Sequence, residues 1–160
     1  MMIVLDTCII TEIIRPEPHR QVMQWLDAQD ANQLCLTAVT VTELFTAIQA
    51  LPDPRRSQLN TALLALLNEE FANRLLPFDA HCALRAAALA AELRRQGITL
   101  AQADLYTAAI CLHHQAQLAT RRPQDFHYCG LSVLNPWGEQ GKPRFHEDAA
   151  EYFVMSRKER

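Results

Sequence analysis

Residues 2–14, MIVLDTCIITEII, decide how this chain begins to fold. The first four of them are apolar on both faces and rich in branched side chains, which predicts a short, fully buried strand of a parallel sheet. Thr7 can cap a helix that runs to about Ile14. Asp6 lies between the two elements, where it could be a helix cap, a metal ligand or a nucleophile. The thiol of Cys8 could instead be the reactive group.

Helical and strand patterns alternate along the rest of the chain as far as residue 137. Helices are predicted at 19–29, 39–51, 55–74, 80–96 and 101–115, strands at 33–38, 75–78, 116–120 and 131–136, and a turn or short helix at 122–126. Asp79 should cap one of these helices, and Gly97 should end it. This alternation predicts an α/β fold in which helices cover both faces of a parallel sheet.

The composition is that of a soluble globular protein. Apolar residues make up 49% and charged residues 21% of the 160, which is enough for one core, and no run resembles a membrane span. The first apolar run lacks a basic n-region, so we expect no signal peptide and take the cytoplasm as the default location. Five scattered cysteines without a C-x-x-C pair argue against a disulfide framework or a zinc knuckle.

The segment after Trp137 has a different character, with two glycines, a proline and alternating charges. Residues 147–155 can form a short helix. We therefore expect one domain at residues 1–137 and a loose C-terminal tail at residues 138–160.

Neither the histidines nor the net charge indicates a second binding function. His113 and His114 are neighbours on a predicted helix, where adjacent side chains point in different directions, so we do not expect them to chelate one ion together. The net charge is −3, whereas nucleic-acid binders are usually basic. A polyanionic substrate would therefore have to be attracted by local arginines or by a bound cation.

Four acids fall where ligands bind in open α/β sheets, beyond the carboxyl ends of the strands. They are Asp6 after the first strand, Glu43 early in the helix after the second, Asp104 early in the helix before the fourth, and Asp125 just after the fourth. Taken singly, each also fits a structural role as a helix cap, a residue favoured near a helix N-terminus or a turn residue. The topology nevertheless brings all four to one edge of the sheet.

Clustered carboxylates repel one another and raise each other's pKa unless a cation joins them. A hard divalent ion such as Mg²⁺ suits oxygen ligands, and it can activate a water and stabilise charge on a phosphate. No histidine or cysteine cluster accompanies the four acids. The sequence therefore favours metal-assisted phosphodiester hydrolysis over zinc chemistry.

Four segments resemble the PIN-domain ribonucleases, specifically the VapC/FitB-type toxins of bacterial toxin–antitoxin pairs. They are IVLDTCIITEIIRPEP (3–18), LTAVTVTEL (36–44), ADLYTAAI (103–110) and LATRRPQDF…GLSVLNPW (118–137). The resemblance implies a three-layer α/β/α sandwich with a five-stranded parallel sheet in the order 3-2-1-4-5. It also implies endonucleolytic cleavage of RNA that depends on Mg²⁺ or Mn²⁺.

The resemblance further implies partners. A small cognate antitoxin would insert a segment into the acidic groove, the toxin would be a homodimer, and operator DNA would be bound only through the antitoxin. No membrane is involved.

By the same resemblance, the four acids are both the catalytic residues and the metal ligands. Asp6 and Asp104 would contact the ion most directly, while Glu43 and Asp125 would complete the pocket through water or a second ion. The residues implied to orient a carboxylate or to contact a phosphate are Thr7, Thr120 and Arg121.

Three features depart from the family pattern. The family usually has Asn where this chain has Cys8, and a thiol braces the site less well because it is a weaker hydrogen-bonding group. The family often has Asn where this chain has Arg122, which could instead hold a phosphate together with Arg121. The segment beyond Trp137 is not part of the pattern.

Other functions remain open at this level. A haloacid-dehalogenase-type phosphatase would need a second Asp at the position of Cys8, and a cysteine hydrolase would need a histidine near that thiol. The remaining alternative is a catalytically weak interaction domain that mainly binds an antitoxin or another regulatory partner.

Overall fold

The structure, a computed structural model, describes residues 1–138, so the predicted tail lies outside the described residues from residue 139 on. Its strands are β1 (Ile3–Leu5), β2 (Leu34–Thr37), β3 (Leu75–Leu76), β4 (Gln117–Ala119) and β5 (Val133–Leu134). They form one sheet in the order β3-β2-β1-β4-β5. All four strand pairs are parallel. The strand order and the parallel pairing both confirm the implied sheet.

Strand β1 is the centre of this sheet. Ile3 pairs with Leu34 of β2 on one side and with Gln117 of β4 on the other. All three residues of β1 are buried, as the unbroken apolar run predicted. The carboxyl end of β1 therefore lies between those of its two neighbours, at the point where the strand order reverses.

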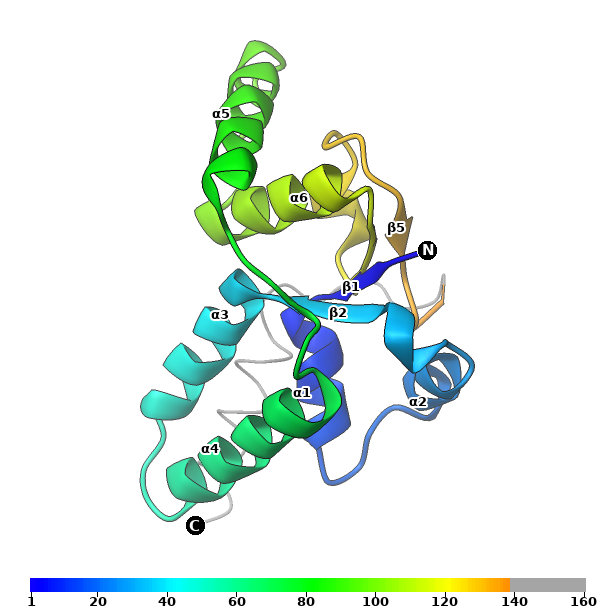
Figure 1. Cartoon of the computed structure of the whole chain (residues 1–160), viewed down its shortest axis with the longest axis vertical. Helices are drawn as coiled ribbons and strands as arrows, with labels where there is room; N and C mark the ends of the chain where they lie inside the picture. Colours follow the sequence, from blue (N-terminus) through cyan, green and yellow to red (C-terminus); the bar gives the residue numbers. More distant parts are fainter. Residues whose placement is uncertain (139–160) are drawn as a thin grey trace.

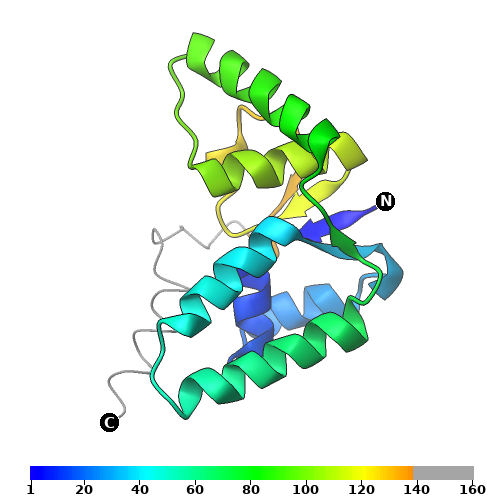
Figure 2. The same ribbon diagram turned by 60° about the vertical axis from the view of Figure 1, so that its left-hand side comes forward.

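Helices cover both faces of the sheet (Figure 1). They are α1 (Thr7–Ile14), α2 (Arg20–Asp27), α3 (Ala38–Gln49), α4 (Arg55–Ala65), α5 (Ala80–Arg95) and α6 (Gln102–His114), with short 3₁₀ turns η1 (Ala31–Gln33) and η3 (Pro123–Phe126). Figure 2 shows α1 to α4 on one side of the sheet and the α5–α6 pair on the other. None of the described helices is long and apolar enough to cross a membrane.

The two cores follow from the alternation of side chains along each strand. Ile3 and Leu5 point into a core that the α1–α4 side of the molecule completes. Val4 points the other way, into a second core with Leu118 and residues of α5 and α6 such as Leu89. Burial on both faces explains why the strands read as continuous apolar runs rather than as alternating patterns.

The predicted helix at 55–74 is helical as far as Glu70, but it changes type and ends four residues early. The α-helix ends at Ala65, and a π-helical segment, η2 (Leu66–Glu70), follows it. Leu59, Leu63, Leu67 and Phe71 are all buried and recur every four residues. On an α-helix this spacing drifts by about 40° a step. The wider π turn offsets the drift and keeps Leu67 and Phe71 facing the core.

Candidate functional site

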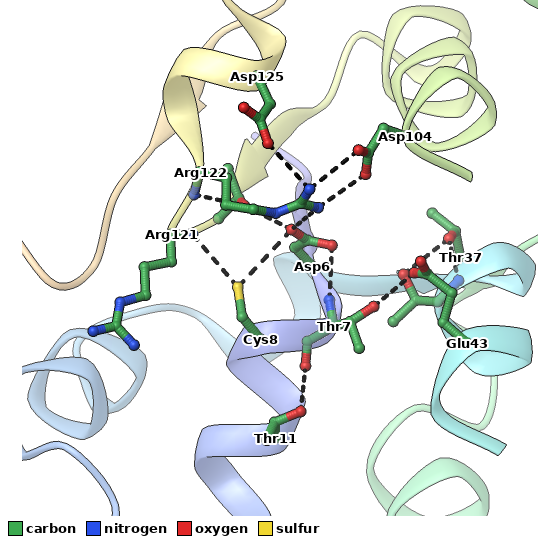
Figure 3. A network of polar contacts seen from close by, with 12 residues as sticks. Asp6, Thr7, Cys8, Thr11, Thr37, Glu43, Asp104, Arg121, Arg122 and Asp125 are labelled. Atoms are coloured by element: carbon green, nitrogen blue, oxygen red, sulfur yellow. Dashed lines mark hydrogen bonds and ion pairs between the residues drawn. The ribbon is translucent and has the colours of Figure 1, made fainter. Parts of the chain in front are cut away.

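The four predicted acids come from four separate elements that meet at the carboxyl edge of the sheet. Asp6 follows β1, Glu43 lies on α3, Asp104 lies in the first turn of α6, and Asp125 lies on η3. Figure 3 shows their side chains turned toward one another around a shared space. Asp6 and Asp104 are buried, while Glu43 and Asp125 are half-buried.

Asp6 both caps a helix and faces the site. Its Oδ1 accepts a hydrogen bond of 2.8 Å from the amide of Thr7, which makes Asp6, rather than the predicted Thr7, the N-cap of α1. Its Oδ2 accepts a 2.6 Å hydrogen bond from the hydroxyl of the buried Thr120, just beyond β4. Each carboxylate oxygen of Asp6 is held by one hydrogen bond, so the carboxylate cannot rotate freely.

Thr7 connects Asp6 to Glu43. Its hydroxyl donates a 2.8 Å hydrogen bond to Oε2 of Glu43. Thr37 caps α3 by accepting a hydrogen bond from the amide of Thr40, and so fixes the start of the helix that carries the acid. Burial raises the pKa of Glu43, the bond from Thr7 lowers it, and the nearby charge of Asp6 raises it again, with a net rise.

Arg122 occupies the middle of the cluster, between the other three acids (Figure 3). Its Nη2 lies 2.9 Å from Oδ1 of Asp104 and 3.5 Å from Oδ2 of Asp6. Its Nη1 lies 3.1 Å from Oδ2 of Asp104 and 3.1 Å from Oδ2 of Asp125. Burial lowers the pKa of the guanidinium, but the bond to Asp104 and the three carboxylate charges raise that pKa by more.

The surroundings of the Cys8 thiol do not suit a nucleophile. Burial, and then the charge of Asp6, raise the pKa of its thiol far above the usual range, so the reactive thiolate is disfavoured. Its sulfur accepts a long hydrogen bond of 3.4 Å from the amide of Arg121 and lies 3.9 Å from Oδ2 of Asp6. The thiol therefore braces the loop after β4 only weakly.

The two arginines after β4 have different surroundings. Arg121 turns its side chain away from the acids (Figure 3). Its guanidinium carbon lies 5.3 Å from the ring centre of Trp137. Arg122 turns inward. The predicted contacts Thr7 and Thr120 therefore adjoin the acids, while Arg121 lies outside the carboxylate cluster.

The pocket suits a cation. Its donors are carboxylate oxygens, two of the acids are buried, and a guanidinium already stands among three of them as the counter-charge. Without positive charge, such a group of acids would be destabilised by mutual repulsion. A hard divalent ion prefers the same oxygen donors.

Sequence reasoning did not anticipate two features of the described residues. The first is the pairing of Arg122 with the acids, which only the inward turn of its side chain reveals. The second concerns the two neighbouring histidines, which we did not expect to share an ion and which lie close to a third ligand atom. Ligand atoms of Cys82, His113 and His114 all lie within 4.8 Å of one another, because the N-terminus of α5 packs against the last turn of α6.

Known proteins resemble the chain over most of its length. The plasmid stability protein StbB of Pseudomonas syringae pv. tomato is 41% identical over 137 residues, covering 85% of this chain and 99% of that protein. A VapC ribonuclease of Sinorhizobium fredii is 39% identical over 137 residues, covering 85% of this chain and 98% of that protein.

Solved structures show the same fold. FitAcB from Neisseria gonorrhoeae has a TM-score of 0.81 at 35% identity, covering 86% of this chain and 99% of that one. FitAB bound to a DNA fragment also has a TM-score of 0.81, at 33% identity, covering 87% of this chain and 98% of that one. The PIN-domain profile matches residues 3–127. The chain therefore belongs to the PIN-domain family.

Proposed function

We propose that this protein is an endoribonuclease that depends on Mg²⁺ or Mn²⁺ and acts as the toxin of a toxin–antitoxin pair. The observation that carries the proposal is the meeting of four carboxylates from four elements at the switch point of the sheet. The relatives support it, since one is named a VapC ribonuclease and the matching solved structures are FitAB complexes.

The ion would be held by the acids around the space that Arg122 now shares. Asp6 and Asp104 are its direct ligands, and Glu43 and Asp125 complete the pocket through water or a second ion. When bound, the ion supplies a more acidic water and stabilises the charge that develops on a phosphate. This chemistry suits phosphodiester hydrolysis, because the phosphate is the group attacked.

The remaining residues orient the acids. Thr120 holds Oδ2 of Asp6, and Thr7 holds Oε2 of Glu43, so two carboxylates have fixed directions before substrate arrives. The raised pKa of Glu43 makes this carboxylate more ready than an ordinary glutamate to take a proton. We assign Glu43 the role of accepting the proton from the attacking water.

The partners follow from the same comparison. RNA is the substrate. Because this chain carries an excess of negative charge, the bound ion and arginines such as Arg121 have to attract the RNA. A small antitoxin binds at the acidic groove, the toxin forms a homodimer, and operator DNA is bound through the antitoxin. The solved structure of FitAB bound to a DNA fragment supports this assignment.

A second candidate function is a catalytically weak domain that mainly binds the antitoxin. The pairing of Arg122 with three acids favours it, because a partly neutralised group of acids attracts a divalent ion less strongly. RNA cleavage by the isolated protein distinguishes the two functions, since the weak domain would cleave no faster than its own Asp6→Asn variant.

The test compares carboxamide variants on cellular RNA. Asp6→Asn and Asp104→Asn should abolish cleavage while the protein stays folded, because an Asn at position 6 can still cap α1. The matched control is Asp27→Asn, which makes the same chemical change at an exposed position at the end of α2 and should cleave normally. Full activity of folded Asp6→Asn would contradict the assignment.

A further inference from the structure

We propose that Arg122 is an internal counter-ion of the acidic pocket, which a divalent ion must displace before the site can work. The inference rests on the proposed function and concerns the loading of that same site. Two guanidinium nitrogens contact three carboxylates, at 2.9–3.5 Å.

The guanidinium and a metal ion cannot share these oxygens. Mg²⁺ needs its ligand oxygens at about 2.0–2.1 Å and tolerates little deviation from octahedral geometry. Arg122 uses both oxygens of Asp104 and the inner oxygen of Asp6, which are the acids assigned as direct ligands. A second positive charge at this distance would also repel the first. Binding of one cation therefore opposes binding of the other.

The position of Arg122 is built rather than incidental. Its amide donates a 3.1 Å hydrogen bond to the hydroxyl of Thr120, the same hydroxyl that donates to Asp6. Its guanidinium carbon also lies 5.9 Å from the ring centre of the buried Phe126. Thr120 thus links the backbone of Arg122 to Asp6, so the side chain of Arg122 extends toward the acids from a fixed position.

Displacement is nevertheless feasible. About a fifth of the Arg122 side chain is exposed, at 22%, so solvent and an incoming ion can reach it. Leaving the carboxylates would carry its charge toward the surface, next to the equally charged Arg121. The displaced side chain would then add positive charge where a polyanion approaches the site.

The consequence is a high threshold for metal. In the free protein Arg122 offsets part of the negative charge of the acids, and only a divalent concentration that outcompetes Arg122 fills the site. Removing the competing charge should therefore tighten metal binding even though it removes no ligand. Removing a neighbouring arginine that lies outside the cluster should change metal affinity less, because it alters only the general charge of the surroundings.

The test measures Mn²⁺ binding directly by calorimetry and electron paramagnetic resonance, without reference to cleavage. Arg122→Gln should bind Mn²⁺ at least about tenfold more tightly than the wild type, and Arg122→Lys should fall between them, because an ammonium cannot bridge three acids as a planar guanidinium does. The matched control is Arg121→Gln, which removes the same charge from the next position and should stay within about twofold of the wild type.

The outcomes separate the two levels of the argument. Equal Mn²⁺ affinity in the wild type and Arg122→Gln would overturn the competition and leave the proposed metal site intact. Absence of Mn²⁺ binding in all the proteins would overturn both. If Arg122→Gln fails to fold without metal, the comparison of Arg122→Lys with the wild type decides, and equal affinity there likewise overturns the competition.

A separate cluster carries a second inference, and the geometry points to a site for a borderline-soft cation such as Zn²⁺. The sulfur of Cys82 and ring nitrogens of His113 and His114 lie within 4.8 Å of one another. The ring of His81 stacks on His113, with centroids 5.6 Å apart. Thiolate and imidazole are the ligands that Zn²⁺ takes in tetrahedral sites.

This cluster is distinct from the acidic pocket. His114 ends α6, about 15 Å along the helix from Asp104. Cys82 lies in the first turn of α5 and is buried, while the two histidines are half-exposed. Binding would release the thiol proton to solvent, and a water would fill the fourth position of a tetrahedral ion.

The test titrates Zn²⁺ into EDTA-washed protein and measures binding by calorimetry. The titration is repeated with Co²⁺, whose visible absorption reports ligation by a thiolate. Cys82→Ser and His113→Ala should each weaken Zn²⁺ binding at least about tenfold, in line with the loss of one direct ligand. His127→Ala, which removes an exposed histidine elsewhere, should not. Zn²⁺ binding that survives Cys82→Ser unchanged, or no Zn²⁺ binding at all, would overturn this site.

Discussion

Replacing Thr120 with Val tests whether one hydroxyl organises the pocket. The substitution keeps the branched shape and removes the oxygen that donates 2.6 Å to Asp6 and accepts 3.1 Å from the amide of Arg122. Thr120 is fully buried, so water does not readily replace the lost partner of Asp6. A hydrogen bond to a charged group contributes about 1.5–3 kcal/mol, and a buried donor left without an acceptor costs about 1–3 kcal/mol.

Water can reach the half-buried Arg122, so we take about 1 kcal/mol from the second range and expect a loss of about 2.5–4 kcal/mol in the free energy of unfolding. For a protein of this size, that is a fall of roughly 5–15 °C in Tm. The assay is urea and thermal unfolding of metal-free protein, followed by circular dichroism. Thr42→Val is the matched control, because its hydroxyl bond to the carbonyl of Ala38 is exposed. We expect it to change stability by less than about 0.5 kcal/mol.

A double-mutant cycle assigns the effect to its partner. If the bond to Asp6 dominates, Thr120→Val should cost about 1–2 kcal/mol less in the Asp6→Asn background than in the wild type. Equal stability of Thr120→Val and Thr42→Val would refute the view that this hydroxyl fixes the carboxylate. An unchanged cost in both backgrounds would assign the effect to Arg122 alone.

Two further predictions concern the pocket. Glu43 has a raised pKa in the folded protein, so its ionisation opposes folding. The stability that protonated Glu43 contributes is fully present below its unfolded pKa, and it is lost as the pH rises through its folded pKa. Glu43→Gln should therefore stabilise the metal-free protein at neutral pH and give no gain below about pH 4, near the unfolded value, and urea unfolding across this range checks the sign. The same variant should lower RNA cleavage by about a hundredfold if Glu43 accepts a proton. Cys8→Asn should keep or increase cleavage, because an amide can both accept from Arg121 and donate to Asp6, and complete loss of cleavage would show a chemical role for the thiol.

Local sequence was sufficient for most of the fold because single residues mark the ends of its elements. Asp79 caps α5 by accepting a hydrogen bond from the amide of Cys82, and Gly97 follows the helix with φ of 71°, as both were predicted to do. The π segment after Ala65 was not predictable in this way. It depends on where the core lies relative to Leu67 and Phe71, which is a property of the packed molecule.

The acids could be selected from the sequence because strand ends of a parallel sheet share one edge, and the structure brings them together there. The direction of Arg122 could not. A side chain that follows a strand can turn either way, and Arg121 and Arg122 turn in opposite directions. The sequence also did not reveal that the neighbouring histidines lie close to Cys82, since that proximity arises from contact between two helices rather than from spacing within one.

The most direct test of the central claim is metal add-back to purified, partner-free protein. The protein is stripped with EDTA, incubated with total cellular RNA, and assayed with and without added Mg²⁺ or Mn²⁺, with Asp6→Asn in parallel. The four-carboxylate site predicts cleavage only by the wild type and only with added metal. Equal cleavage in excess EDTA, or equal cleavage by Asp6→Asn, would contradict it.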